Sequence, residues 1–276
     1  MFYVPDLATF LPSRPAPVSV ALPDDESKHA GVLRLAVGSP VQLCDGRGRV
    51  VQGKVDVVGS KKQPARVLVE GVEVVEVVEV VEVVAPVTST AWHVAVACGS
   101  LKGSRGDWLV EKCAEIGAAT LTPVLTARSQ RVGAKERERY ERIAVSVMKQ
   151  SLQAWKMDVC APCGLFEYLD GLDAGRAASA TSTTSTTSTT STTRVFVGAE
   201  SAGGFGEVLC ACRAPSVDGR RVEKAVVLVG PEGDFTPEEL EGLLARGVTP
   251  VGLGARRLRT ETAAVVMLSA GIVALE

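Results

Sequence analysis

Apolar segments and amphipathic segments alternate through the chain after Pro86. Five apolar runs are typical of strands: TAWHVAVAC, ATLTPVL, RVFVGAE, AVVLVGPEG and TPVGLG. DWLVEKCAEIG predicts an amphipathic helix that ends at Gly117, and a second, basic helix is expected over residues 135–155. Because parallel strands need a crossover connection, this alternation predicts an α/β domain with a largely parallel sheet.

The first 70 residues read as short strands and turns instead. VQLCDGRGRVVQGKV predicts a β-hairpin that turns at Asp45 and Gly46, and RVLVE predicts a further strand. The sequence therefore predicts three parts: a small β-rich domain over residues 1–72, a connector over 73–85 and the α/β domain over 86–276.

Two low-complexity tracts interrupt this organisation. Residues 73–84 repeat Glu-Val-Val and residues 181–193 repeat Ser-Thr-Thr, and a period of three residues suits neither a strand nor a helix. We expect the first tract to be an irregular, partly extended connector and the second to be a mobile surface loop. Neither tract is expected to carry chemistry.

The amino-acid composition excludes several classes of protein. Hydrophobic residues make up 46% and charged residues 22% of the 276, which excludes a mainly disordered chain. A net charge of −2 excludes a globally basic nucleic-acid binder, and 4% aromatic residues argue against a surface that reads bases mainly by stacking. The longest apolar run, residues 263–275, is too short for a membrane span, and the N-terminus has no signal-peptide pattern. We therefore expect a soluble cytoplasmic protein.

Basic residues are nevertheless clustered in two stretches. Between residues 128 and 156, eight Lys and Arg oppose three Glu, a local charge of +5; between 47 and 62, five oppose one Asp, a local charge of +4. Such patches supply the salt-dependent phosphate contacts of nucleic-acid binding. For the first stretch, a solvated helix face with Glu–Arg pairs is the alternative.

The seven cysteines allow a metal site only as an alternative. Cys160 and Cys163, together with Cys210 and Cys212, are two thiol pairs that in principle supply the four ligands of a structural zinc ion. Neither pair stands in a glycine-rich knuckle and the two histidines stand apart, so reduced thiols and no metal are expected.

Three loops that follow predicted strands form the candidate site, because ligands of such sheets lie beyond the carboxyl ends of the strands. The loops are Gly198-Ala199-Glu200, Gly230-Pro231-Glu232-Gly233-Asp234, and the stretch from Leu253 to Thr262. The middle loop leads into a helix that has Thr236 as N-cap, Pro237 at the first position and Glu239 to complete a capping box.

The chemistry of these loops argues against a phosphate site. The middle loop carries Glu232 and Asp234 and no lysine, and the chain has no G-x-G-x-x-G fingerprint after a strand and no P-loop motif. A ligand with hydroxyls, amide-like edges or a positive charge fits better, and a sulfonium nucleoside has all three. The third loop leads, with Thr260 or Thr262 as cap, into a helix so apolar that burial on all sides is expected.

Four motifs occur in the order found in one family. VGPEGDFTPEEL and LGARRLRTETA resemble the paired C-terminal motifs of the SPOUT methyltransferases. KGSRGDWLVEKCAEIGAATLTPV and MKQSL resemble the first helical and central motifs of the 16S ribosomal RNA uridine-N3 methyltransferases (RsmE type), and HAGVLRLAVGSPVQLCDGRGR resembles their PUA-like RNA-binding domain. The resemblance covers nearly the whole chain apart from the two repeats.

The resemblance implies a fold and a reaction. It implies a C-terminal SPOUT-type α/β domain with a trefoil knot, a preceding PUA-like β-barrel, and a homodimer whose active site draws on both subunits. The reaction would be methylation of N3 of one uridine in the decoding region of 16S rRNA, in the small ribosomal subunit. S-adenosylmethionine would be the methyl donor and S-adenosylhomocysteine the product.

The resemblance also implies roles for named residues. Cofactor contacts are expected from Gly198, Ala199, Glu200, Val229, Gly230, Pro231, Glu232, Gly233, Leu253, Gly254, Leu258, Arg259, Thr260, Glu261, Thr262 and Ala263. RNA contacts are expected from His29, Arg34, Arg47, Lys102, Arg105, Arg128, Arg131, Arg139, Arg142 and Arg256. Arg259 is expected to stabilise the anionic uracil or orient the RNA; Glu261 is expected to hold Arg259, accept the N3 proton or cap the last helix.

Two positions depart from the family pattern. Gln153 stands where arginine is frequent, and Arg257 stands where an aliphatic residue is usual. Arg257 is expected to contact a phosphate or to point to solvent, and neither departure is expected to touch the glycine framework of the cofactor loops.

The sequence leaves three other functions open. One is a different SPOUT RNA methyltransferase that acts on transfer RNA or on a ribose hydroxyl. Another is a non-catalytic RNA-binding ribosome-assembly factor that keeps the fold, against which the presence of Gly230, Glu232, Gly233, Gly254 and Glu261 argues. The third is a zinc-stabilised binding module.

Overall fold

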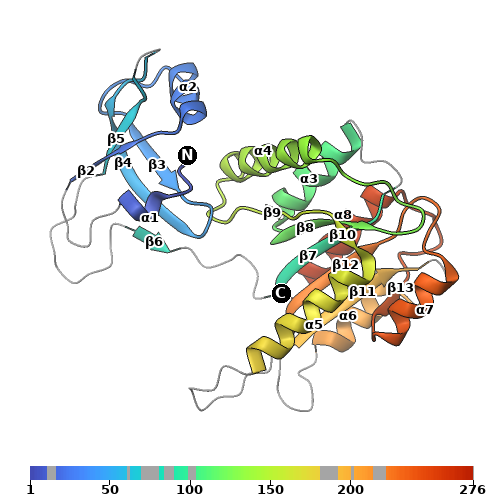
Figure 1. Ribbon diagram of the computed structural model, residues 1–276. Helices are drawn as coiled ribbons and strands as arrows, with labels where there is room; N and C mark the ends of the chain where they lie inside the picture. The colour runs from blue at the N-terminus through green and yellow to red at the C-terminus, as the bar shows by residue number, and fades with distance from the viewer. Residues whose placement is uncertain are drawn as a thin grey trace. The chain divides into compact units, whose positions relative to one another are not determined.

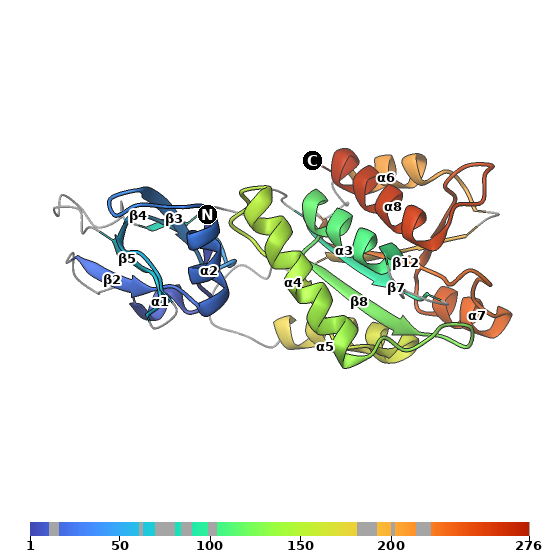
Figure 2. The same cartoon turned by 90° about the horizontal axis from the view of Figure 1, so that it is seen from above.

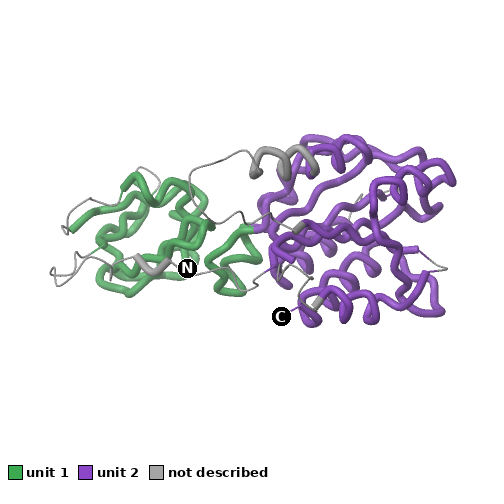
Figure 3. Tube along the Cα trace, turned by 90° about the horizontal axis from the view of Figure 1, so that it is seen from below, with its two compact units in different colours: residues 1–86, 145–156 green, residues 87–144, 157–276 purple. Residues whose placement is uncertain are grey.

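The computed structural model describes residues 1–10, 17–60, 63–69, 81–83, 90–98, 104–180, 192–199, 202–213 and 222–275. The chain divides into two compact units, which are coloured separately in Figure 3. The first unit comprises residues 1–86 and 145–156, and the second comprises 87–144 and 157–276. Residues 145–156, expected from the sequence to belong to the α/β domain, therefore group with the N-terminal unit.

A six-stranded sheet forms the first unit. Its elements are β1 (Phe2–Tyr3), α1 (Leu7–Phe10), β2 (Val18–Ala21), α2 (Asp24–Val32), β3 (Pro40–Cys44), β4 (Arg49–Val57), β5 (Arg66–Val69) and β6 (Val81–Val83). The order is β1-β3-β4-β5-β2, with β6 paired to β4, and every pair except β1–β3 is antiparallel. Apolar side chains from these elements, including Phe2, Leu43, Val51 and Val67, form one buried core.

The hairpin predicted around Asp45 is confirmed, since β3 and β4 pair antiparallel up to Cys44 opposite Val50. Asp45 has only 4% of its surface exposed. Its Oδ1 accepts hydrogen bonds from the backbone N–H groups of Arg47 at 2.7 Å and Arg49 at 3.1 Å. The buried carboxylate thus satisfies the donors of the turn that joins the two strands.

The end of helix α4 (Ala134–Gln150) and the residues after it complete this unit. Lys149 Nζ lies 2.7 Å from Glu26 Oε1 on α2, and 19% and 8% of these side chains are exposed. The backbone N–H of Lys156 donates to the carbonyl oxygen of Gly46 at 2.9 Å. The N-terminal sheet therefore depends on a segment from far along the chain.

A seven-stranded sheet forms the second unit (Figure 1). Its strands are β7 (Ala91–Val96), β8 (Thr120–Leu125), β9 (Asp158–Val159), β10 (Cys163–Gly164), β11 (Thr192–Gly198), β12 (Val222–Val229) and β13 (Thr249–Val251). The order is β10-β8-β7-β12-β11-β13, with β9 paired to β8, and every pair is parallel. The predicted parallel α/β sheet is confirmed.

Helices cover both faces of this sheet. They are α3 (Ser104–Ile116), α5 (Leu165–Ala180), α6 (Phe205–Arg213), α7 (Pro237–Ala245) and α8 (Thr260–Leu275), together with the start of α4. Figure 2 shows α3, α6 and α8 on one side of the strands and α5 and α7 on the other. On the second side, Leu165 of α5 and Leu243 of α7 share a core with Val226 and Leu228 of β12. On the first side, α8 packs against α3, α6, β7 and β12.

Two expectations about elements were wrong. The basic helix ends at Gln150 rather than at residue 155, and Leu152 follows with a left-handed φ of +55° that a helix cannot continue. Thr192 and Thr193, expected in a mobile loop, begin β11, while the rest of that tract lies outside the described residues. The Glu-Val-Val tract was expected to be partly extended, and its residues 81–83 do form the short strand β6; the remainder lies outside the described residues.

Helix α8 is also less enclosed than its apolar sequence predicted. Ala264, Met267 and Leu268 are fully buried, but 39% of Val266 and 78% of Val273 is exposed. The expectation of burial on all sides is therefore wrong for a single chain. None of the described helices combines the length and apolar composition that crossing a membrane requires.

Candidate active site

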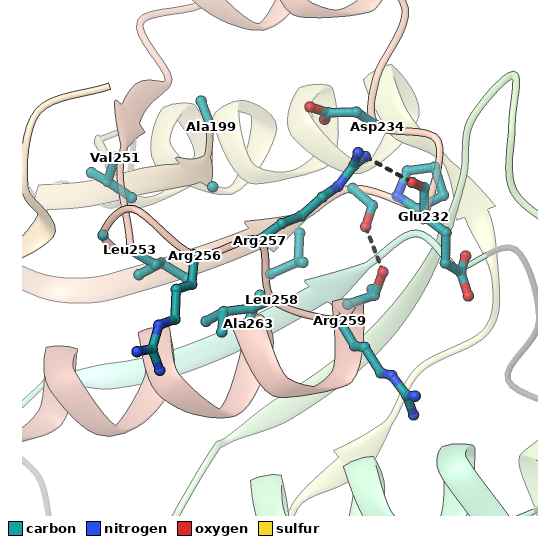
Figure 4. A pocket seen from close by; sticks show the side chains of 16 residues that line it. Ala199, Glu232, Asp234, Val251, Leu253, Arg256, Arg257, Leu258, Arg259 and Ala263 are labelled. Atoms are coloured by element: carbon teal, nitrogen blue, oxygen red, sulfur yellow. Dashed lines mark hydrogen bonds between the residues drawn. The ribbon is translucent and has the colours of Figure 1, made fainter. Parts of the chain in front are cut away.

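Three loops converge at the carboxyl ends of β11, β12 and β13, where the sequence predicted a binding site. Strand β11 lies between the other two, with Val197 opposite Leu228 of β12 and Gly198 opposite Val251 of β13. The loops enclose a pocket of about 340 Å³, a size within the range of small-molecule sites (Figure 4). It is lined by Gly198, Ala199, Val229, Gly230, Pro231, Glu232, Asp234, Val251, Leu253, Gly254, Arg256, Arg257, Leu258, Arg259, Thr260 and Ala263.

The β12–α7 loop is a tight turn. The N–H of Asp234 donates to the carbonyl oxygen of Pro231 at 2.8 Å, and Asp234 has a left-handed φ of +60°. Its Oδ1 accepts from the N–H of Phe235 at 2.8 Å. A Cβ at Gly230 would lie 2.9 Å from the Phe235 ring, so only glycine fits where the strand enters the turn.

Helix α7 begins as predicted, and its start fixes the end of this turn. Thr236 Oγ1 accepts from the N–H of Glu239 at 3.2 Å, while Glu239 Oε2 accepts from the N–H of Thr236 at 2.9 Å. Pro237 occupies the first helical position, so the predicted capping box is confirmed. Glu239 Oε1 also accepts from the N–H of Ala127 at 2.8 Å, which joins the helix to the loop after β8.

Two arginines donate to the carbonyl oxygens of the turn. Arg257 Nη2 lies 3.0 Å from the carbonyl oxygen of Glu232, and Figure 4 shows its side chain reaching across the pocket to that atom. Arg128 Nη1 donates to the carbonyl oxygen of Gly233. The expectation that Arg257 leaves the glycine framework untouched is therefore wrong: it joins the third loop to the second.

The third loop is tied to β12 at its end. Thr260 Oγ1 donates to the carbonyl oxygen of Gly230 at 3.1 Å. Thr260 is the first residue of α8, and the carbonyl oxygen of Arg259 accepts the first helical bond, from Ala263. Neither expected threonine cap is present, because Thr260 uses its hydroxyl to join the two loops and Thr262 lies inside the helix. Gly254 supplies the left-handed φ of +99° that turns this loop.

Charges of both signs line the pocket, and the three arginine side chains point in three different directions (Figure 4). Arg105 Nη1 lies 3.7 Å from Glu232 Oε1, and both side chains are nearly half exposed. Arg259 and Glu261 have no ion pair and no side-chain hydrogen bond among the described residues. Glu261 therefore does not pair with Arg259 in the described part of the chain, and the role of Glu261 stays a prediction.

A buried thiol lies close to these charges. Cys98 follows β7 and has 6% of its surface exposed. Burial is the main cause that raises its pKa; Glu232 and Glu261 act in the same direction and Arg105 opposes them. The thiol is therefore protonated at neutral pH and is a poor nucleophile, so it has no evident chemical role.

The structure brings most of the predicted cofactor residues together. Gly233, Glu261 and Thr262 lie beside the pocket without lining it, and Glu200 lies outside the described residues. Four lining residues were not predicted to contact the cofactor: Asp234, Val251, Arg256 and Arg257. Their position next to predicted residues, at the end of a strand, in the turn and in the third loop, was the available signal.

The basic residues predicted to contact RNA have varied surroundings. In the first unit, the ring of His29 contacts Phe2 edge-on at 5.9 Å, and Arg34 has a left-handed φ of +52°. Arg47 donates its N–H to Asp45. These three lie in the unit that contains the hairpin.

In the second unit, several of the predicted RNA contacts already have partners. Arg139 pairs with Asp107 of α3, Arg128 with the turn and Arg105 with Glu232. Of the remaining predicted residues, Arg131 lines a second hollow at the start of α4 and Arg142 lies on α4 itself. Arg256 lines the pocket described above, and Lys102 lies outside the described residues.

The described residues contain no group of three or more His, Cys, Asp or Glu placed to hold a metal ion. Cys160 directly follows β9 and Cys163 begins β10, whereas Cys210 and Cys212 lie on α6, and all four are free thiols. The four-thiolate zinc alternative is therefore not formed by this part of the chain.

Comparison with known proteins identifies the family. A family model described as an RNA methyltransferase domain matches residues 88–271. Two curated relatives carry the name ribosomal RNA small subunit methyltransferase E. The one from Synechocystis sp. is 27% identical over 247 residues, which are 86% of this chain and 67% of the relative. The one from Bacillus subtilis is 29% identical over 185 residues, 64% of each chain. The alignments thus span about two thirds of these relatives.

Solved structures share the fold over both units. A probable rRNA methyltransferase from Porphyromonas gingivalis is 29% identical, with a TM-score of 0.68, and the match covers 97% of this chain and 94% of that one. A ribosomal RNA small subunit methyltransferase E from Neisseria gonorrhoeae, solved with S-adenosyl methionine, is 23% identical with a TM-score of 0.72, covering 98% and 94%. The chain therefore belongs to the RNA methyltransferase family.

Proposed function

We propose that this protein transfers the methyl group of S-adenosylmethionine to N3 of one uridine in the decoding region of 16S rRNA, within the small ribosomal subunit. Family membership supports methyl transfer to RNA, and the similarity to two relatives named ribosomal RNA small subunit methyltransferase E supports small-subunit rRNA as the substrate. The observation that carries the proposal for this chain is the convergence of three loops on one pocket at the carboxyl ends of β11, β12 and β13. The reaction is expected in the cytoplasm.

The pocket fits S-adenosylmethionine by the chemistry of its lining. Apolar side chains suit the faces of an adenine ring: Val229, Val251, Leu253, Leu258 and Ala263. Carboxylates and guanidinium groups at the rim suit a ligand that carries an ammonium, a carboxylate and a sulfonium. At Gly230 a Cβ would meet Phe235, so the glycine allows the ring of Phe235 to pack against the backbone that lines the pocket.

S-adenosylmethionine supplies a methyl group that is already activated by its sulfonium. The protein therefore has to position the uracil nitrogen in line with that methyl, and positioning of this kind contributes about 7–11 kcal/mol. The N3 proton must also leave, and the developing uracil anion needs a stabilising positive charge. Arg259 lines the pocket and its guanidinium is unpaired among the described residues, so we assign it this stabilising role. Glu261, two residues later, is the candidate proton acceptor.

The finer description of the fold belongs to the same proposal. We expect the three pocket loops to form a trefoil knot, and the resemblance of their motifs to those of the SPOUT methyltransferases supports this expectation. The contacts of Thr260 with Gly230 and of Arg257 with Glu232 join the third loop to the second. The N-terminal sheet is expected to be a PUA-like barrel that contacts RNA.

The protein is also expected to act as a homodimer. Val266 and Val273 of α8 are exposed, as is 40% of Trp108 on the neighbouring helix α3. Exposed apolar side chains on two packed helices are typical of a surface that another protein covers. A second copy of this chain is the expected partner.

The proposal is tested by methyl transfer from labelled S-adenosylmethionine to small ribosomal subunits that lack their native modification, followed by nucleoside analysis. Labelled 3-methyluridine is the expected product. A different labelled nucleoside, or transfer only to transfer RNA, would assign the enzyme another RNA target. Cofactor binding without transfer to any RNA would point to the assembly-factor alternative.

A further inference from the structure

The turn between β12 and α7 is held from two sides by arginines that belong to other loops. Arg257, on the β13–α8 loop, donates to the carbonyl oxygen of Glu232 at 3.0 Å. Arg128, on the loop after β8, donates to the carbonyl oxygen of Gly233. The acceptors belong to the two central residues of the turn, so each arginine fixes one of its peptide planes through a charge-assisted hydrogen bond.

Arg128 is itself firmly placed. Its Cδ lies 3.1 Å from the position that a Cβ at Gly233 would take, so its stem covers the turn. Its loop is anchored on both sides, because Ala127 donates to Glu239 at 2.8 Å and the N–H of Gln130 donates to the carbonyl oxygen of Cys98 at 2.9 Å. Arg128 is therefore committed to the turn rather than extended toward a phosphate.

The turn needs support from outside. Asp234 adopts a left-handed φ of +60°, a conformation that costs a non-glycine residue free energy. Such a conformation persists when surrounding contacts over-determine it. Within the turn, the bonds from Asp234 to Pro231 and from Phe235 to Asp234 contribute. Arg128 and Arg257 contribute from the two neighbouring loops.

We propose that Arg128 and Arg257 are positioning residues that hold residues 231–234 in the shape that walls the pocket, and that they thereby set its affinity for S-adenosylmethionine. The identity of the ligand rests on the proposed function. When either arginine is lost, the turn populates other shapes, and the apparent affinity falls by the fraction of molecules that remain competent to bind. The proposal removes Arg128 from the expected RNA contacts.

This role is tested by substitutions that remove the hydrogen-bond donors of each arginine but keep the apolar part of its side chain. Arg257→Leu and Arg128→Leu keep an apolar stem and remove every donor, whereas Arg257→Lys and Arg128→Lys keep one charged donor. Arg246→Leu is the matched control, because Arg246 donates to the carbonyl oxygen of Gly242 at 3.3 Å, near the other end of α7.

Calorimetric titration with S-adenosylmethionine gives the first readout. We expect the dissociation constant to rise about tenfold in each leucine variant, to rise less in the lysine variants and to stay unchanged in Arg246→Leu. The KM for the ribosomal subunit and its salt dependence should stay at their wild-type values, because the proposal commits both guanidinium groups to the turn and not to RNA.

Hydrogen exchange of the ligand-free protein gives a second readout that does not depend on the cofactor. The amides of Asp234 and Phe235 are protected by the bonds described above. They should exchange faster in both leucine variants and at the wild-type rate in the control.

Unchanged exchange together with an unchanged cofactor affinity overturns the inference. A raised subunit KM and a weaker salt dependence for Arg128→Leu, at constant cofactor affinity, also overturns it and returns Arg128 to the RNA contacts. If the wild-type protein binds no S-adenosylmethionine, the proposed function fails. The exchange rates then decide by themselves whether the arginines hold the turn.

Discussion

His93 shows how the interior of the sheet acts on one titratable side chain. It lies on β7, with its Nδ1 2.8 Å from Thr120 Oγ1. Its Nε2 is buried without a hydrogen-bond partner in the described part of the chain. Burial, with a smaller contribution from the charge of Lys224, lowers its pKa from 6.5 to about 4. The folded protein therefore keeps the imidazole neutral.

This lowered pKa predicts acid sensitivity. Protons bind the unfolded chain at His93 from about pH 6.5 downward but bind the folded protein only near pH 4, so stability is lost as the pH falls between these values. The full loss is about 3 kcal/mol. Urea unfolding across this pH range measures it, and His93→Gln should flatten the pH dependence. An identical pH dependence in the variant would show that other groups cause the loss.

Arg259 is predicted to act on the reaction rather than on cofactor binding. Replacement by alanine removes an unpaired guanidinium from the pocket lining and should lower kcat by about 10²–10³. The dissociation constant for S-adenosylmethionine should change by less than about threefold, which is less than about 0.7 kcal/mol. Single-turnover transfer and calorimetry on the same variant measure the two quantities. Equal losses in both would sink the catalytic assignment.

At the scale of elements, α8 depends on a glycine. A Cβ at Gly271 would overlap the ring of Trp92, which is completely buried. Gly271→Ala should therefore destabilise the protein by about 1–3 kcal/mol through overpacking. Gly171→Ala, on α5, is the matched control: its Cβ would meet nothing within 4 Å, so helix propensity should make it stabilising by about 0.5–1 kcal/mol. Chemical denaturation distinguishes the two, and equal effects would contradict this account.

Helix α4 should contribute to RNA binding through only some of its basic residues. Arg137 pairs with Glu141 at 3.0 Å and Arg139 pairs with Asp107, whereas Lys135 and Arg142 have no ion pair among the described residues. Lys135→Ala and Arg142→Ala should each reduce the slope of log K against log salt by about one. Binding to ribosomal subunits at several salt concentrations measures this slope. Arg139→Ala, which breaks a contact between α3 and α4, should change stability more than the slope.

The elements also show what the sequence can predict. Strands such as β12 were predictable because burial on both faces requires continuous apolar residues. Helix α2 was missed because its first turn is Asp24, Asp25 and Glu26 and it has little apolar periodicity. The end of α4 was misplaced because its last residues and those after it pair with the N-terminal unit, a tertiary effect that local pattern does not contain.

The candidate site was also predictable where its features are local in the sequence, and not where they depend on contacts between loops. Glycines and the capping box mark the turns in the sequence itself, so the loops at Gly230 and Gly254 could be identified. The partner of Arg257 could not, because it depends on how two loops approach each other in space. The same holds for Thr260, which was expected to cap its helix and instead bonds to Gly230.

At the scale of the whole molecule, the pair formed by Glu26 and Lys149 should be important for the N-terminal unit. Both side chains are largely buried, so Lys149→Met would leave a buried carboxylate without its cation and should cost about 3–5 kcal/mol. Lys28→Met is the control, because Lys28 and Asp25 form an exposed pair whose loss should cost under about 1 kcal/mol. Thermal and urea unfolding measure both. Similar small effects would mean that water reaches Glu26 readily.

The N-terminal unit is built from two separate segments of the chain, and this has a consequence for its folding during synthesis on the ribosome. Its two stretches, residues 1–86 and 145–156, are separated by a long part of the other unit. At roughly 5–20 residues per second, the intervening stretch of about sixty residues takes several seconds to emerge. During that time the nascent N-terminal sheet lacks the segment that bonds to Gly46 and neutralises Glu26. The part of the chain that is made first therefore has to wait for a later segment before it can finish folding, although that segment still emerges before the second unit is complete.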